Sequence, residues 1–198
     1  MEYTLKEVKL LKPLEYVFPH HLKNLSEMIL KDNMIKQPLV VDKDYNIILD
    51  GSHKFIFLSM NGYKYAPVYE VDYSNQHIRV GSHRKHSISV EDYNATLSKE
   101  EIIRRGIIGN LFPPRTTRHI FPFKRPDINI PLEKLGKQEP MDVSSLIAKV
   151  DISEEINHNE NYIKEIDEEI KEICNHLNDV DSIKEYLKEQ IRRMKCEL

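Results

Sequence analysis

The chain has 198 residues, of which 40% are hydrophobic and 31% are charged, and this composition is typical of a globular protein with one or two small domains. No stretch is as long and apolar as a membrane span, the N-terminus lacks signal-peptide character, and two cysteines offer no disulfide framework, so we expect a cytoplasmic protein with no membrane partner. Residues 1–150 carry 22 Lys and Arg against 18 Asp and Glu, and residues 151–198 carry 7 against 14, a balance that suits an anionic small molecule and makes nucleic acid an unexpected partner.

The first fifty residues alternate between strand and helix patterns. Residues 3–10 alternate loosely between polar and apolar side chains and predict a strand, which a loop at Pro13 follows. Over residues 20–33 the apolar side chains fall at helical spacing and predict an amphipathic helix. Short apolar runs then predict strands at 39–41 and 47–49.

The stretch 47–59 joins the second of these strands to a helix through a tight turn. Its run 55–58 is apolar on every face, so we expect strand and helix to lie deep in a core. The helix start offers free N–H groups and the positive end of the helix dipole, which suit phosphate oxygens. The candidates for holding a nucleotide's phosphates are Asp50, Gly51, Ser52, His53 and Lys54. The alternative is an ordinary strand–turn–helix with Ser52 as N-cap.

Residues 61–136 continue the same kind of alternation. Strands are predicted at 66–73 and 78–80. Ser98 and Glu101 form a capping box that starts a helix over 99–105, which the next residue, a glycine, closes. The chain then becomes extended and proline-rich. Together the elements predict a compact α/β (α+β) domain with a mixed sheet over residues 1–136.

The remainder of the chain changes character. Residues 137–150 are predicted to be a linker, and residues 151–198 to be helical, because stepping alternately by four and three residues from Ile152 to Leu198 finds an apolar side chain at twelve of fourteen positions. One interpretation is a coiled coil that joins two copies into a homodimer through residues 152–198. The other is a helical hairpin broken at Asn178 and Asp179.

One glutamate and two polar clusters are further candidates for a functional site. Glu15 lies in a loop before a helix, where a desolvated carboxylate near a substrate hydroxyl can act as general base, and a solvated loop glutamate is the alternative. The segment 115–119 holds two guanidinium groups, two hydroxyls and an imidazole, which suit capture of a carboxylate or phosphate, although a basic surface loop is equally compatible. Residues 83–86 (His-Arg-Lys-His) lack acidic or thiol company, so we expect a solvated strand end and no metal site.

These clusters converge on one family pattern, since residues 3–135 resemble the ParB/sulfiredoxin superfamily and, within it, the free L-serine kinases of archaeal type. Leu11-Lys-Pro-Leu-Glu15 is similar to that branch's Lys-Pro-x-Glu element, and Ile48-Leu-Asp-Gly-Ser-His-Lys54 is similar to its Asp-Gly-His-His-Arg element. Residues 105–123, which contain Thr-Thr-Arg-His-Ile-Phe-Pro-Phe, are similar to its Thr-Thr-Arg-His-x-x-Pro-Phe signature. The Asp-Gly element is shared across the superfamily, and the last segment is much more specific to the kinases.

The resemblance implies a ParB/sulfiredoxin-like fold and a reaction in which a nucleotide, ATP or ADP with Mg²⁺, passes a phosphoryl group to the hydroxyl of free L-serine. It implies that Glu15 is the base, that Asp50 orients the phosphates or the magnesium, and that residues 51–54 hold the phosphates. The substrate-binding residues that it implies are Thr116, Thr117, Arg118, His119 and His83. Phosphoryl transfer depends mainly on positioning and charge neutralisation, which such residues supply. The ligands of the metal are not assigned.

The chain departs from the kinase pattern at three positions. Ser52 stands where the branch has its first His, and Lys54 stands where it has Arg, which keeps the charge and loses the planar fork. His83 stands where a tryptophan is expected near the substrate, so the amino acid that is phosphorylated stays open. Residues 85–98 are also shorter than the inserted lobe of the family.

Two other members of the superfamily define the alternatives. A ParB-like, DNA-associated regulator would use the same pocket for a nucleotide and the tail for dimerisation, but no helix-turn-helix is evident and the tail is acidic. Sulfiredoxin chemistry requires a cysteine at the phosphate motif, where this chain has Ser52.

Overall fold

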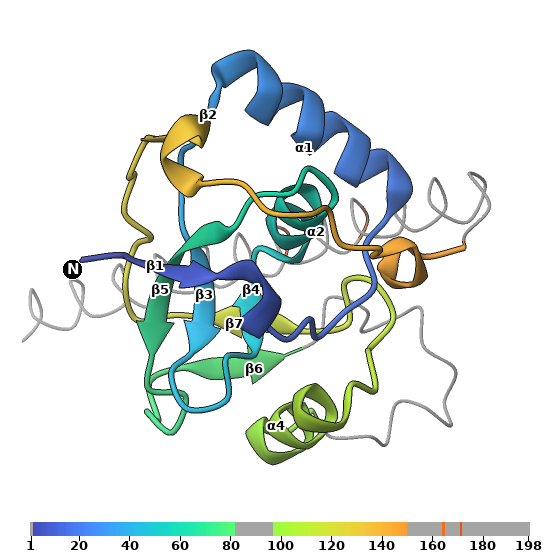
Figure 1. Cartoon of the computed structure of the whole chain (residues 1–198). Helices are drawn as coiled ribbons and strands as arrows, with labels where there is room; N and C mark the ends of the chain where they lie inside the picture. Colours follow the sequence, from blue (N-terminus) through green and yellow to red (C-terminus); the bar gives the residue numbers. More distant parts are fainter. Residues whose placement is uncertain (1, 82–96, 150–163, 165–170, 172–198) are drawn as a thin grey trace, which may run out of the picture. The chain divides into compact units, whose positions relative to one another are not determined.

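The computed structural model describes residues 2–81, 97–149, 164 and 171 (Figure 1). Contacts divide the chain into two units, residues 1–151 and 152–198, and every element named below belongs to the first. Residues 2–81 and 97–149 hold three α-helices, which are α1 (Pro19–Asp32), α2 (Ser52–Met60) and α4 (Lys99–Ile108). Their strands are β1 (Thr4–Glu7), β2 (Met34–Ile35), β3 (Leu39–Asp42), β4 (Ile48–Asp50), β5 (Tyr65–Val71), β6 (Arg79–Gly81), β7 (Arg118–Ile120) and β8 (Ile130–Pro131).

A four-stranded mixed sheet forms the centre of this unit, with the strand order β1-β5-β3-β4. Strand β5 is antiparallel to β1 and parallel to β3, and β3 is antiparallel to β4. The parallel pair is possible because β4 and α2 lie between β3 and β5 in the chain and supply the crossover. The prediction of a mixed α/β fold with a mixed sheet is therefore confirmed. Two small pairs, β2 with β8 and β6 with β7, complete the strands described.

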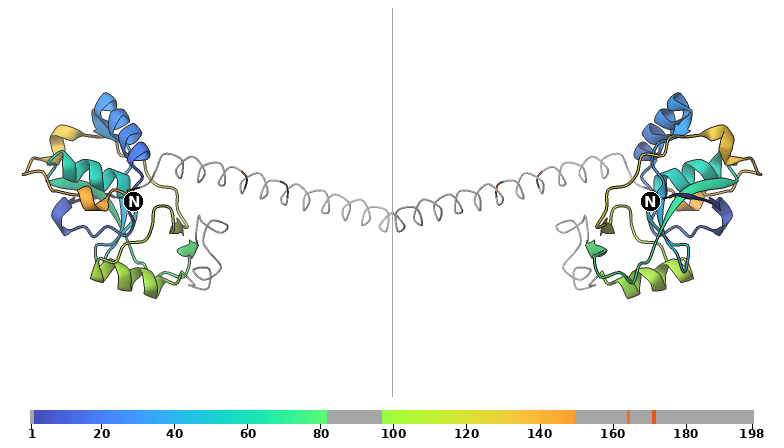
Figure 2. Two further views of the ribbon diagram at one scale, coloured as in Figure 1. Left: turned by 90° about the vertical axis from the view of Figure 1, so that its right-hand side faces the viewer. Right: turned by 90° about the vertical axis from the view of Figure 1, so that its left-hand side faces the viewer.

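Both faces of this sheet are buried. Successive strand residues point to opposite sides, so β3, β4 and β5 each contribute side chains to two core clusters. One face packs with α1 and α2 in a core cluster whose sheet residues include Leu39, Val41, Ile48, Ala66 and Val68. The other face packs with α4 and the segment after it, in a cluster that includes Val40, Ile47, Leu49, Val71, Ile102 and Phe112. Figure 2 shows α1 at the top of this unit and α4 at the bottom in both side views, with α2 between them.

The middle of helix α2 is buried on every side, as its apolar run predicts. The side chains of residues 55–59 are all buried. The residue before the helix is Gly51, at φ 101°, so Gly51 and not Ser52 occupies the N-cap position. A Cβ atom at Gly51 would lie 3.0 Å from Leu39 Cγ, so both the backbone angle and the close approach of β3 require glycine here. The turn into α2 is thereby packed directly onto the sheet.

Helix α4 continues beyond the predicted end at Gly106. It runs to Ile108, and Gly109 follows in the left-handed region at φ 70°. Gly106 is buried inside the helix, where a Cβ atom would lie 2.6 Å from Ile47 Cδ1, so this glycine permits close packing on the sheet and does not end the helix. The prediction that Gly106 closes the helix was wrong, because glycine is required here by close packing on Ile47 and not by a helix end.

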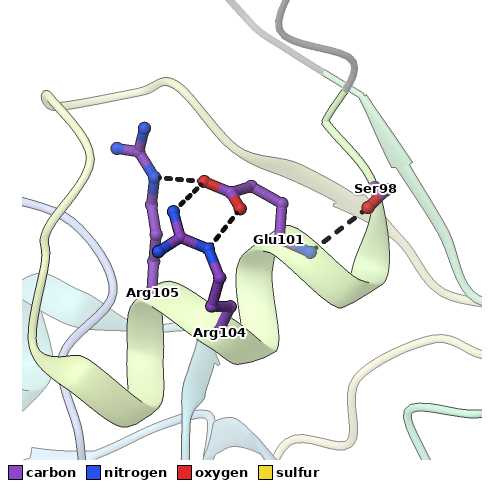
Figure 3. A network of polar contacts seen from close by, with 4 residues as sticks. All are labelled: Ser98, Glu101, Arg104 and Arg105. Atoms are coloured by element: carbon purple, nitrogen blue, oxygen red, sulfur yellow. Dashed lines mark hydrogen bonds and ion pairs between the residues drawn. The ribbon is translucent and has the colours of Figure 1, made fainter.

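A capping box has two bonds, one from the Glu101 N–H to the Ser98 hydroxyl and one from the Ser98 N–H to the Glu101 carboxylate, and the start of α4 shows the first of them. The N–H of Glu101 donates to Ser98 Oγ at 3.2 Å (Figure 3). The Glu101 carboxylate accepts bonds from Arg104 Nε at 2.7 Å and Arg105 Nε at 2.8 Å. The carboxylate therefore serves the next turn of the helix in place of reaching back to the cap.

Residues 137–149, expected as a linker, are attached to this unit along their length. The N–H of Gln138 donates to Gly62 O at 2.8 Å, and that of Ala148 donates to Val17 O at 2.9 Å. Val143 lies in the core at 4% exposure. The coiled-coil and hairpin interpretations of residues 151–198 and the cluster at His83 lie outside the described residues. Within the described ranges, no helix has the length and hydropathy to cross a bilayer.

Candidate functional site

A cavity of about 380 Å³ is formed where the end of β4, the first turn of α2, the start of α1 and the loop before it meet the segment after α4. The residues that line it are Glu15, Tyr16, His21, Leu25, Ile48, Leu49, Asp50, Gly51, Ser52, His53, Lys54, Arg115 and Thr117. The structure thus brings together Glu15, all five residues of the predicted phosphate turn and one of the four predicted substrate residues of segment 116–119.

Glu15 is held at the cavity wall by two neighbours from the segment after α4. Phe112 brackets it along the backbone, since the Phe112 N–H donates to Leu14 O at 2.9 Å and the Tyr16 N–H donates to Phe112 O at 3.0 Å. The Glu15 carboxylate accepts from Thr117 through one oxygen, Oε1, which takes both the main-chain N–H and the side-chain hydroxyl, the latter at 2.6 Å. The glutamate is half-buried and has a defined orientation.

Three other predicted substrate residues do not line the cavity. Thr116 is buried at 7% exposure, and its hydroxyl donates to Pro113 O at 2.8 Å. Arg118 and His119 lie on β7, which pairs with β6. His119 Nε2 lies 2.9 Å from the Tyr73 hydroxyl, so its ring belongs to the core side of that pair. The fifth, His83, lies outside the described residues.

The first turn of α2 forms another part of the cavity wall. The Phe55 N–H donates to Gly51 O at 3.0 Å and is the first bond of the helix. The N–H groups of residues 52–54 precede it and have no carbonyl within the helix to bond. Because the helix dipole adds a partial positive charge at the same place, this wall favours an anion.

His53 in this turn is kept neutral by its surroundings. Burial lowers the pKa of His53 to about 4, with smaller contributions from His21 and Arg115, and Asp50 opposes the shift. The His53 and His21 rings meet edge to face with their centroids 6.0 Å apart. The Nε2 atom of His53 is buried and has no hydrogen-bond partner among the residues described. A buried polar atom in that state at a cavity wall suits a bond with a ligand.

Lys54 has its ammonium anchored to the backbone. Its Nζ donates to Gln37 O at 3.1 Å and to Pro38 O at 3.3 Å. Burial lowers the pKa of Lys54 to about 8, against the attraction of Asp50. An ammonium has three donors, and two are used here. Lys54 therefore contributes charge to the wall, with at most one donor left for a ligand.

Two arginines near the cavity were missing from the predicted site. Arg115 lines the cavity in a left-handed backbone conformation at φ 56°; the sequence placed it in the polar cluster 115–119, but it was not among the residues to which substrate binding was assigned. Arg125 forms an ion pair with Asp50 across 75 residues of sequence. No spacing or motif connects Arg125 with Asp50, so sequence reasoning had no signal for this contact.

The described residues contain no group of three or more His, Cys, Asp or Glu side chains arranged to hold a metal ion. The carboxylates that line the cavity are Glu15 and Asp50. Mg²⁺ in nucleotide sites is commonly held by one or two carboxylates together with the phosphates of the substrate. The donors present therefore fit a Mg²⁺ ion that arrives with a nucleotide.

No family model matches the chain. A curated relative, the ATP-dependent L-serine kinase of Staphylothermus marinus, is 29% identical over 84 residues, which cover 40% of this chain and 33% of the relative. The match thus spans about a third of that protein's length.

Solved structures of free serine kinase share the fold. One in complex with AMP has a TM-score of 0.59 at 18% identity and covers 69% of this chain and 94% of that chain. A mutant of free serine kinase in complex with ADP gives a TM-score of 0.59 at 18% identity, with 69% and 95% covered. SbnI with a C-terminal truncation, from Staphylococcus aureus, gives 0.57 at 14% identity, with 83% and 96% covered. At these identities the likeness shows the fold.

Proposed function

We propose that this chain is a small-molecule kinase that transfers the terminal phosphoryl group of ATP or ADP to the hydroxyl of free L-serine and releases O-phospho-L-serine. The observation that carries this proposal is that the oriented carboxylate of Glu15 and the free N–H groups at the start of α2 line one cavity. The names of the relative and of the structural neighbours support both a nucleotide and serine as ligands.

The transfer follows from these two walls. Glu15 accepts the proton of the serine hydroxyl while the serine oxygen forms a bond to the terminal phosphorus. The bond from that phosphorus to the bridging oxygen of the nucleotide breaks, and the shortened nucleotide leaves with the electron pair. The N–H groups of residues 52–54 and the Arg115 guanidinium neutralise the charge on the phosphoryl oxygens. His53, neutral at pH 7, adds a bond to a phosphate oxygen through the ring nitrogen that carries its proton.

Mg²⁺ would be held by the phosphate oxygens together with Asp50. Bound there, it neutralises charge on the transferring group. Asp50 already accepts from Arg125, so its carboxylate has a defined partner before any ligand arrives. Arg125 thereby contributes to the same wall without lining the cavity.

Product formation tests the proposal directly. The purified full chain is incubated with Mg²⁺, L-serine and either ATP or ADP, and O-phosphoserine is followed by ³¹P NMR, with D-serine and L-threonine as acceptor controls. We expect O-phosphoserine with at least one nucleotide. No product with either nucleotide, together with DNA binding that weakens with salt, would contradict the kinase and favour the ParB-like regulator. Light scattering on the same sample tests the predicted homodimer through residues 152–198.

A further inference from the structure

Thr117 has both of its hydrogen-bond donors on Glu15. Its main-chain N–H and its hydroxyl meet the same carboxylate oxygen, Oε1. A threonine has one N–H, one hydroxyl proton and the hydroxyl lone pairs. With both donors used, Thr117 has none to offer the carboxylate of an amino acid. The family resemblance, by contrast, implies that Thr117 binds the substrate.

The neighbouring threonine is committed as well. The Thr116 hydroxyl donates to Pro113 O at 2.8 Å, and the side chain is buried. The hydroxyls of both threonines therefore have partners within the protein, and Arg115 also lines the cavity and brings a positive charge to it. Two adjacent side chains of the same type thus have different partners, and one of these partners is the proposed base.

The segment that carries Thr117 is itself fixed on α4. The Arg105 guanidinium lies over the Phe112 ring at 4.2 Å from its centroid. Arg105 is in turn bonded to Glu101, as Figure 3 shows. Since Phe112 brackets Glu15 along the backbone, the glutamate receives its position from Phe112 and its carboxylate orientation from Thr117.

We propose that Thr117 is a positioning residue for the general base: it holds the ionised Glu15 carboxylate toward the serine hydroxyl and does not bind the amino acid. This inference rests on the proposed function, because it takes Glu15 as the base. Donors on a carboxylate favour its ionised form, so the two bonds from Thr117 also keep Glu15 able to accept a proton at lower pH. Thr117 thereby contributes to both the orientation and the proton affinity of the Glu15 carboxylate.

The test compares Thr117→Val, which removes the hydroxyl and keeps the shape, with Thr117→Ser, which keeps the hydroxyl. We expect Thr117→Val to lower kcat by about ten- to hundredfold, since misplacing a reacting group costs factors of this size. The KM for serine should change by less than about threefold, because no contact with the substrate is lost. The acidic limb of the pH profile should move to higher pH, and Thr117→Ser should restore both kcat and the limb.

A readout that needs no turnover accompanies the kinetics. In ¹³C NMR of glutamate-labelled protein, the Glu15 carboxyl should titrate at higher pH in Thr117→Val than in the wild type. Thr4→Val is the matched control, because Thr4 also donates to a glutamate, Glu70, at 3.3 Å on the exposed side of β1. Thermal melting checks that each variant is folded.

The possible failures are distinguishable. A wild-type chain that forms no O-phosphoserine contradicts the proposed function. An active wild type with a Thr117→Val variant of unchanged kcat contradicts the inference alone. A Thr117→Val variant whose serine KM rises while its acidic limb stays in place would make Thr117 a substrate-binding residue and overturn the inference.

Discussion

Arg125 pairs its guanidinium with the carboxylate of Asp50, the last residue of β4, at the wall where the phosphates are proposed to lie. The contact connects the segment before β8 to the turn that starts α2. Asp50 also attracts the buried ammonium of Lys54, and Arg125 repels it. Two cations and one carboxylate therefore share this wall, and the state of Lys54 depends on both partners.

Replacing Arg125 with glutamine should raise the pKa of Lys54 above its value of about 8. The substitution removes a nearby positive charge and leaves the Asp50 carboxylate to interact more strongly with the ammonium. NMR titration of labelled lysine side chains measures this directly. Arg104→Gln is the control, since Arg104 pairs with Glu101 on the exposed surface of α4. An unchanged or lower pKa of Lys54 would show that Arg125 does not act on this wall.

Glu15→Gln should lower the rate of O-phosphoserine formation by roughly 10²–10⁴-fold, the usual contribution of a general base. The amide has the same shape and cannot take the proton. Nucleotide affinity, measured by calorimetry, should stay close to that of the wild type because the first turn of α2 is unaltered. Glu139→Gln removes an exposed carboxylate from residues 137–149 as a control. Near-normal turnover in Glu15→Gln would exclude Glu15 as the base.

Gly51→Ala should lower the free energy of unfolding by about 1–3 kcal/mol, the usual cost of strained backbone at a non-glycine residue. The position has φ 101°, and the new Cβ would lie 3.0 Å from Leu39 Cγ. Urea denaturation measures the change. Gly81→Ala is the matched control, since a Cβ at Gly81 meets no atom within 4 Å. Equal stability of the two variants would contradict the requirement for glycine at the turn.

His53 should make the domain less stable in acid. Its pKa is about 4 in the folded state, against 6.5 ordinarily, so between these values the unfolded chain binds a proton that the folded chain does not. The stability that the neutral His53 side chain contributes is fully present above pH 6.5 and is lost as the pH falls from 6.5 through 4. It amounts to at most about 3 kcal/mol.

The variant His53→Asn should therefore lose less stability than the wild type between pH 7 and pH 4, as measured by urea denaturation at each pH. His77→Asn, which removes an exposed imidazole, is the control for the loss of one histidine. A wild type and a His53→Asn variant with parallel pH profiles would show that burial of His53 does not govern acid stability.

The elements that could be predicted from the sequence are those whose pattern is local. The apolar run of α2 predicted a helix buried on all sides, and the spacing of apolar residues predicted α1 and the strands of the mixed sheet. These predictions succeeded because helix and strand periodicity depend on near neighbours in the chain. Glu15 and residues 50–54 were also recognised from the sequence as site candidates, and the structure places them around one cavity.

Which side chains share that cavity could not be predicted from local patterns, because it depends on long-range packing. Residues adjacent in sequence were separated, since Thr116 points to Pro113 and His119 to Tyr73, while Thr117 reaches Glu15 across 102 residues. Gly106 does not end α4, because the glycine is required by the close approach of Ile47. Such contacts depend on how distant segments pack and on strand pairing, which local propensity does not encode. The partner of each polar group is therefore settled by the fold.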